Sequence, residues 1–172
     1  MSKLLDLTAA ELKDRLLPLS SIKPLALAYL GDTVLDLYVR TRLVAATSLH
    51  PKQMHMKASS LVNAASPAAM MKYLKDSLTP EEQEVFRHGR NAHSGTIPRN
   101  QSPVDYKWAT GFEALLGYLY LTEQEDRLYE LMRRGLDYLE HKDTEAEDSK
   151  EGESTMIDEG EQGANAKEKD NE

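Results

Sequence analysis

The sequence contains no cysteine. Disulfide bonds and thiolate metal sites are therefore excluded, which fits a reducing compartment such as the cytoplasm. No apolar run approaches the roughly 20 residues that a membrane-spanning helix needs. The first residues also lack the apolar segment and the small-residue cleavage site of a secretory signal. We therefore expect a cytoplasmic protein without membrane contact.

Several common catalytic patterns are also missing. The chain has no nucleotide P-loop, no glycine-rich GxGxxG turn and no GxSxG nucleophile motif. Its five histidines show none of the spacings that bind zinc in metalloproteases. The histidines therefore offer no better candidate site than the acids described below.

The net charge of −8 is concentrated at one end of the chain. Residues 141–172 carry twelve acidic and four basic side chains, which leaves seventeen of each sign in residues 1–140. Between positions 40 and 107, ten bases stand against five acids. This basic middle could face phosphates, although basic clusters also occur on ordinary solvated helices.

Helix start signals recur through residues 1–140. Thr79-Pro80-Glu81-Glu82 combines an N-cap, a proline in the first turn and a glutamate three residues after the cap. No segment shows sustained alternation with a period of two, so no sheet is predicted. We predict one all-α domain over residues 1–140, with about seven helices at roughly 8–17, 24–46, 51–64, 66–76, 79–88, 102–121 and 122–140. Residues 141–172 have too few apolar side chains to fold and are predicted to be a disordered acidic tail.

The segment 88–100 departs from this helical pattern. It reads His-Gly-Arg-Asn-Ala-His-Ser-Gly-Thr-Ile-Pro-Arg-Asn, with two glycines, one proline and no apolar period. We predict a long basic loop, and long loops in compact domains are often functional.

The most informative residues are acids inside apolar helices. Asp32 and Asp36 are the only charged residues between positions 25 and 39, and Glu113 is the only one between positions 108 and 121. Helices this apolar are expected in a core, where a carboxylate costs several kcal/mol unless it is paired or binds a metal. Gly31 and Gly111 lie near these acids and would permit close helix packing.

Two interpretations of these acids stay open at this point. Asp32 and Glu113 could meet where the two helices pack, and hard oxygen ligands without cysteine would favour Mg²⁺ or Mn²⁺. Alternatively, each acid could pair with a buried arginine or cap a neighbouring helix.

Both helices resemble those of the ribonuclease III family. Leu-Gly-Asp-Thr-Val-Leu, residues 30–35, resembles the signature helix of that family, and Phe-Glu-Ala-Leu-Leu-Gly, residues 112–117, resembles its second catalytic helix. The Gly-Arg-Asn-Ala stretch, residues 89–92, and the residues that follow it are similar to the loop of the short branch called Mini-ribonuclease III. This branch has the catalytic domain without a double-stranded RNA-binding domain, and the resemblance covers roughly residues 20–140.

The resemblance implies an all-helical, Mg²⁺-dependent endoribonuclease that cuts double-stranded RNA as a homodimer, with Mn²⁺ as a possible substitute. The products would carry a 5′-phosphate and a 3′-hydroxyl. For the short branch, the implied substrate is the precursor of large-subunit (23S) ribosomal RNA, and a ribosomal protein bound to the substrate is an implied partner.

Carried over by position, Asp32 matches the catalytic aspartate of the family and Glu113 matches its metal-binding glutamate. Larger members have two more acids, at positions that here hold Ala28 and Thr110, so the number of metals and their coordination stay open. We expect RNA contacts from the basic and polar residues of the loop and its neighbours: Arg90, Asn91, His93, Ser94, Arg99, Lys52, Lys57 and Arg87.

Two alternatives remain beside the nuclease. The first is a non-catalytic protein of the same fold that binds structured RNA or assists ribosome assembly. The second is a helical regulatory dimer that binds a protein, with Asp32 and Glu113 in structural ion pairs.

Overall fold

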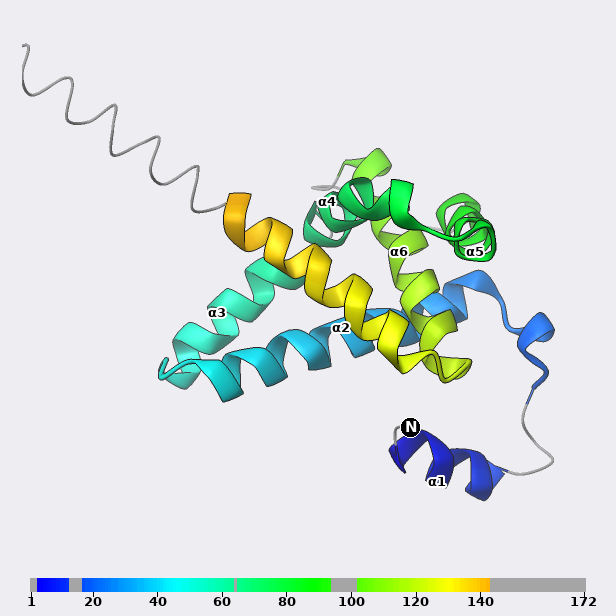
Figure 1. Ribbon diagram of the computed structural model, residues 1–172, viewed down its shortest axis with the longest axis horizontal. Helices are drawn as coiled ribbons and strands as arrows, with labels where there is room; N and C mark the ends of the chain where they lie inside the picture. Colours follow the sequence, from blue (N-terminus) through cyan, green and yellow to red (C-terminus); the bar gives the residue numbers. More distant parts are fainter. Residues whose placement is uncertain (1–2, 13–16, 64, 94–101, 143–172) are drawn as a thin grey trace, which may run out of the picture.

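The computed structural model describes residues 3–12, 17–63, 65–93 and 102–142 (Figure 1). These residues form seven α-helices, two short 3₁₀-helices and no strand, so the predicted all-α fold is confirmed for them. None of these helices is long and apolar enough to cross a membrane. The elements are α1 (Lys3–Leu12), η2 (Leu19–Ser21), α2 (Pro24–Ala46), α3 (Pro51–Val62), α4 (Ala65–Leu74), η3 (Lys75–Ser77), α5 (Pro80–Asn91), α6 (Pro103–Leu121) and an unlabelled last helix, residues 125–142.

Helix α6 forms the centre of the molecule. Helices α2, α4 and α5 all pack against it (Figure 1), and buried side chains lie on most sides of it. This follows from its sequence, since a helix that is apolar on all sides is stable only when other elements surround it. Its buried residues join those of α2, α4 and the last helix in one core, which includes Leu35, Val39, Met70, Met71, Leu74, Phe112, Leu115, Leu116, Leu119, Leu131 and Leu136.

Helix α2 is covered on one side only, contrary to the expectation that it lies wholly in a core. Leu27, Gly31 and Leu35 are buried on the side that faces α6. On the other side, Tyr29 is 81% exposed and Val44 is 70% exposed. The apolar sequence of α2 therefore exceeds what a single chain can bury.

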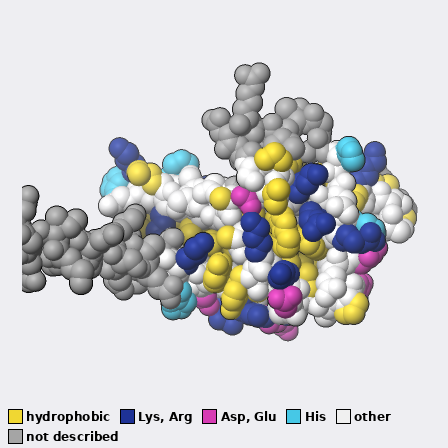
Figure 2. Space-filling view, turned by 90° about the horizontal axis from the view of Figure 1, so that it is seen from above, with side chains coloured by type: hydrophobic (Ala, Val, Ile, Leu, Met, Phe, Trp, Pro, Cys, Tyr) yellow, Lys and Arg dark blue, Asp and Glu magenta, His cyan; other side chains and the backbone are white. Residues whose placement is uncertain are grey.

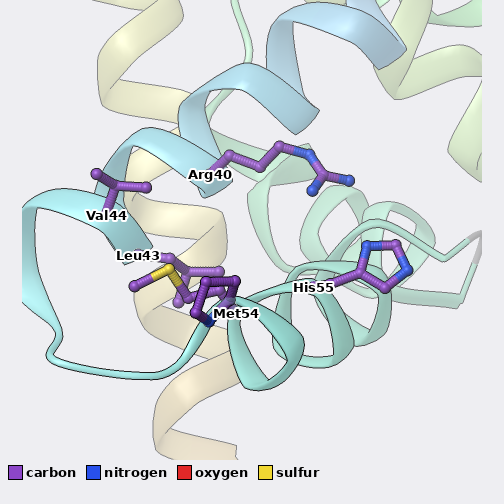
Figure 3. Close-up of a pocket in the computed structure, with 6 residues that line it drawn as sticks. Arg40, Leu43, Val44, Met54 and His55 are labelled. Atoms are coloured by element: carbon purple, nitrogen blue, oxygen red, sulfur yellow. The ribbon is translucent and has the colours of Figure 1, made fainter.

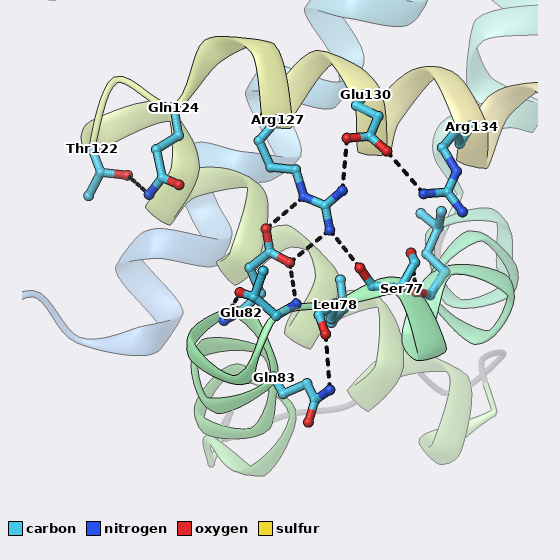
Figure 4. A network of polar contacts seen from close by, with 11 residues as sticks. Ser77, Leu78, Glu82, Gln83, Thr122, Gln124, Arg127, Glu130 and Arg134 are labelled. Atoms are coloured by element: carbon cyan, nitrogen blue, oxygen red, sulfur yellow. Dashed lines mark hydrogen bonds and ion pairs between the residues drawn. The ribbon is translucent and has the colours of Figure 1, made fainter.

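A buried ion pair joins α5 to the last helix (Figure 4). Arg127 donates from Nε to one carboxylate oxygen of Glu82 at 2.7 Å and from Nη2 to the other at 2.9 Å. Glu82 also accepts from the backbone N–H of Thr79, and Arg127 also contacts Glu130 and the carbonyl of Ser77. Every charge in this network has an opposite partner, so it stabilises the packing of the two helices.

Most predicted helix starts agree with the structure. The capping box of Thr79 and Glu82 opens α5, and the Ser102 hydroxyl accepts from the Asp105 backbone N–H at the start of α6. The prediction for the first helix was wrong, because α1 spans Lys3–Leu12 and passes through Thr8, the predicted cap.

Two other boundaries also differ from the predictions. Helix α5 continues to Asn91, so the loop predicted over 88–100 starts later. Thr122 ends α6 instead of starting the last helix, and Glu123 reverses the chain with φ of 57°. Residues 94–101 and the predicted tail from residue 143 onward lie outside the described residues, while the last helix runs to residue 142.

Candidate active site

Two glycines allow α2 and α6 to cross with their backbones in contact. A Cβ atom on Gly31 would overlap the carbonyl oxygen of Glu113, and one on Gly117 would overlap the carbonyl oxygen of Leu27. No larger residue fits at either position while the helices keep this distance. The crossing places Asp32, which follows Gly31, beside Glu113, so the structure brings the two predicted site residues together.

The environments of Asp32 and Glu113 differ. Asp32 lies on an exposed part of α2, contrary to the expectation of a buried acid, whereas Glu113 is largely covered between the helices. Burial raises the pKa of Glu113 to about 7, and the negative charge of Asp32 contributes to the increase. Burial and then the charge of Asp36 raise the pKa of Asp32.

Neither Asp32 nor Glu113 has a cationic partner in the described part of the chain, and neither forms a hydrogen bond there through its side chain. This outcome disfavours the alternative in which each acid pairs with a buried arginine. Two neighbouring carboxylates repel each other when both are ionised, and a bound cation would remove that repulsion.

The donor set of this pair suits a hard divalent cation. Carboxylate oxygens are the ligands that Mg²⁺ prefers, and Mg²⁺ commonly binds to one or two carboxylates while water and phosphate supply the rest. No group of three or more His, Cys, Asp or Glu side chains within the described residues could hold a metal. Among the described residues this pair therefore offers two protein ligands, and other oxygens would complete the coordination.

The two positions that hold acids in larger relatives lie in the same helix interface. Ala28 is 5% exposed and Thr110 is 6% exposed. The Thr110 hydroxyl donates to the carbonyl of Tyr106 at 2.9 Å, so it is already engaged within α6. Neither residue can replace a missing carboxylate.

Asp36 has a different role from Asp32, although one helical turn separates them. Its carboxylate accepts a hydrogen bond from Nε of Arg40 at 2.7 Å. This pair neutralises Asp36 on the surface of α2, so Asp36 serves as a natural comparison for Asp32.

The predicted RNA-contacting residues lie in several places. Arg90 and Asn91 end α5 and His93 follows it, while Ser94 and Arg99 lie outside the described residues. Lys52 and Lys57 are exposed on α3. Arg87 is paired with Glu84 on α5. On the face shown in Figure 2, Lys and Arg side chains stand among hydrophobic ones, and Asp and Glu side chains are also present.

An aromatic pair near the end of α5 was not predicted. The rings of Phe86 and Trp108 lie 5.2 Å apart between centroids, and the guanidinium of Arg90 lies over both. The signal in the sequence was weak, because Trp108 is eighteen residues from Arg90 and no local pattern links them.

Comparison with known proteins gives a consistent result. The model of the ribonuclease III domain matches residues 25–124. Mini-ribonuclease 3 of Symbiobacterium thermophilum is 41% identical over 120 residues, which cover 70% of this chain and 92% of that protein. Mini-ribonuclease 3 of Gloeobacter violaceus is 46% identical over 106 residues, which cover 60% of this chain and 74% of that protein.

A solved structure also shares this fold. A protein from Fusobacterium nucleatum, determined by X-ray crystallography, superimposes with a TM-score of 0.61 and 25% sequence identity. The similarity covers 66% of this chain and 90% of that one. The matched lengths show that the similarity extends well beyond the two helices that carry the short motifs.

Proposed function

Because the chain belongs to the ribonuclease III family and is an endoribonuclease of that type, we propose that Asp32 and Glu113 form its catalytic centre. The observation that carries this proposal is the crossing of α2 and α6, which brings two carboxylates together without a counter-charge. The family acts on double-stranded RNA, works as a dimer and depends on divalent metal ions. We propose Mg²⁺ as the ion, with Mn²⁺ as a substitute.

Asp32 and Glu113 would hold this ion. A divalent cation supplies two effects to phosphodiester hydrolysis when it is bound: activation of water and neutralisation of charge on the phosphate. Gly31 keeps the backbones of α2 and α6 close enough for both carboxylates to take part in holding the ion. The proposed products carry 5′-phosphate and 3′-hydroxyl ends.

The proposed homodimer would use the uncovered side of α2. Tyr29, Leu37 and Val44 on α2 are 81%, 64% and 70% exposed, and Met56 on α3 is 63% exposed. Between these helices lies a hollow of about 210 Å³ whose lining is largely apolar, with Arg40 and His55 reaching out at its edge (Figure 3). Large apolar side chains gathered on one face are typical of an interface, so this face supports self-association.

The proposed substrate is the base-paired precursor of large-subunit (23S) ribosomal RNA. This rests on the resemblance to the short branch of the family, and several relatives carry the name Mini-ribonuclease 3. A ribosomal protein bound to that RNA is a possible further partner, and the cytoplasm is the expected compartment. The proposed RNA contacts are Arg90, Asn91, His93, Ser94, Arg99, Lys52, Lys57 and Arg87.

The test compares wild type with Asp32→Asn and Glu113→Gln on a long RNA duplex at low salt with Mg²⁺. We expect both variants to bind RNA and to cleave it about a thousand-fold more slowly, because a catalytic metal contributes several kcal/mol to the barrier. Asp36→Asn is the matched control, since Asp36 lies one turn along the same helix and is paired with Arg40. It should retain cleavage.

The same experiment also tests the alternative of a non-catalytic RNA-binding protein of this fold, which the missing acids at positions 28 and 110 would favour. Wild type that binds the duplex but does not cut it with Mg²⁺ or Mn²⁺ would establish that alternative. Asp36→Asn losing as much activity as Asp32→Asn would contradict the roles assigned to the two acids.

A further inference from the structure

Arg87 and Arg90 lie one turn apart on α5, but their surroundings differ. Arg87 is exposed, and its Nε donates to Glu84 at 3.2 Å. Arg90 is half-buried, and its guanidinium carbon lies 5.9 Å from the ring centroid of Phe86 and 5.7 Å from that of Trp108. Within the described ranges, no carboxylate forms an ion pair with Arg90. Arg90 is therefore a positive charge held in place by aromatic rings and not neutralised.

The aromatic rings are themselves fixed to α6. Trp108 belongs to that helix, and Phe86 packs against Gly111, where an added Cβ would lie 2.6 Å from the ring. Gly89 approaches the Thr110 carbonyl and the Ala114 side chain in the same way. The last turn of α5 is thus packed tightly against α6, the helix that carries Glu113. Arg90 is therefore held in a fixed position relative to α6.

The contact with the rings leaves the hydrogen-bonding groups of Arg90 available. Its guanidinium carbon lies 5.9 Å from the Phe86 ring centroid and 5.7 Å from that of Trp108, which is the range of a cation–π contact. The N–H groups of a guanidinium can donate to two phosphate oxygens at once. A side chain already held in one conformation also loses less entropy when a ligand binds. A lysine could supply the charge here but not the planar guanidinium with its paired donors.

We propose that Phe86 and Trp108 hold Arg90 ready to bind a phosphate of duplex RNA, so that Trp108 acts as a positioning residue for substrate binding. The proposal rests on the proposed function, since it assumes that the ligand is double-stranded RNA. Trp108 lies five residues before Glu113, which is about 7.5 Å along the axis of α6, and on a different side of the helix. Because the aromatic contact is away from Glu113, we expect Arg90 to act on RNA binding and not on the chemical step.

The first experiment measures KM, kcat and the Kd for a labelled RNA duplex with the full-length protein at several salt concentrations. Arg90→Ala should raise KM and Kd about ten-fold, leave kcat within two-fold and reduce the slope of log Kd against log salt by about one phosphate contact. Arg90→Lys should raise Kd about five-fold although it keeps the charge. Arg133→Ala is the matched control, because Arg133 is an exposed arginine on the last helix paired with Asp137, and its Kd should stay within two-fold of wild type.

The second experiment tests the aromatic contact itself. Trp108→Leu keeps an apolar side chain without a ring face and should raise Kd about five-fold, whereas Trp108→Tyr should restore Kd to within two-fold of wild type. Trp108 is the single tryptophan of the chain, so its fluorescence reports on this site alone. Addition of the duplex should change its emission in wild type, and Arg90→Ala should abolish that change.

Two results would overturn the proposal. The first is an Arg90→Ala variant that binds RNA as well as Arg133→Ala does. The second is a Trp108→Tyr variant that binds as weakly as Trp108→Leu, which would mean that the ring face does not matter. Failure of the proposed function looks different, because wild type would then fail to cleave the duplex whatever residue stands at position 90.

Discussion

Two groups of carboxylates in this protein show opposite electrostatic arrangements. Glu82 is 4% exposed, and Arg127 binds both of its oxygens. Asp32 and Glu113 lie near each other at the crossing of α2 and α6 without a counter-charge among the described residues. The first arrangement stabilises the fold, and the second is costly unless a ligand completes it. The partners of these acids, and not their burial alone, distinguish the acid that stabilises the fold from the two proposed catalytic acids.

The pKa values of the two glutamates move in opposite directions. Burial alone would raise the pKa of Glu82, but the hydrogen bonds from Arg127 and Thr79 outweigh it and lower the pKa below its ordinary 4.5. Burial raises the pKa of Glu113 to about 7, with a further contribution from Asp32. Stability should therefore depend on pH in opposite ways at the two sites.

The largest expected effect comes from adding a side chain at the crossing of α2 and α6, where Asp32 and Glu113 meet. Gly31→Ala would place a Cβ against the carbonyl oxygen of Glu113, so α2 and α6 must separate. We expect a loss of at least about 3 kcal/mol in the free energy of unfolding, because backbone atoms cannot move aside as a flexible side chain can. Urea denaturation measures it.

Gly135→Ala is the control for this prediction. Gly135 is also a helical glycine, but an added Cβ would lie 3.0 Å from Cβ and Cγ of Met70 and would not overlap backbone atoms. The gain in helix propensity offsets part of this tight contact, so the loss should be well below that of Gly31→Ala, at about 1 kcal/mol. If Gly31→Ala and Gly135→Ala lose equal amounts of unfolding free energy, α2 and α6 are not packed more closely at Gly31 than the helices are at Gly135.

The next largest effect on stability comes from removing the charge of Glu82, the acid that is paired with Arg127. Glu82→Gln leaves Arg127 without its main partner and should cost about 3 kcal/mol at pH 7. Since the folded-state pKa of Glu82 lies below 4.5, its contribution is complete above that pH and is lost as the pH falls through the folded value. The difference in stability between the variant and wild type should therefore shrink as the pH falls below 4.5.

Glu130→Gln provides the comparison within the same network. The Glu130 side chain is 41% exposed, although it also contacts Arg127, so its loss should cost less than about 1 kcal/mol. A Glu82→Gln variant as stable as wild type at pH 7 would show that the buried pair adds nothing.

The smallest expected effect is a gain in stability, and it comes from removing the charge of Glu113. In metal-free protein, ionisation of Glu113 disfavours the folded state, so stability should fall as the pH rises from about 4.5 to about 7. Glu113→Gln removes this cost and should be more stable than wild type by about 2 kcal/mol at pH 8, with no difference near pH 4. Urea denaturation in the presence of a chelator at both pH values measures it, and a variant less stable than wild type at pH 8 would contradict the prediction.

Local patterns predicted most helices because the signals act within one turn. Thr79 and Glu82 form the expected capping box, and prolines at 24, 51 and 103 open α2, α3 and α6. Thr8 and Glu11 have the same spacing as a capping box, yet they lie inside α1. Residues three apart also share one face of a helix, so this spacing alone cannot tell a cap from a helix interior.

The sequence by itself determined the kinds of residue available at the site: isolated acids and small glycines in two apolar helices, with no thiol and no zinc-binding pattern. Tertiary structure decided which of them meet. It left one side of α2 uncovered, placed Asp32 at an exposed edge and brought Arg90 onto Trp108. These contacts join residues far apart in the chain, and only the packing of whole helices brings such residues together.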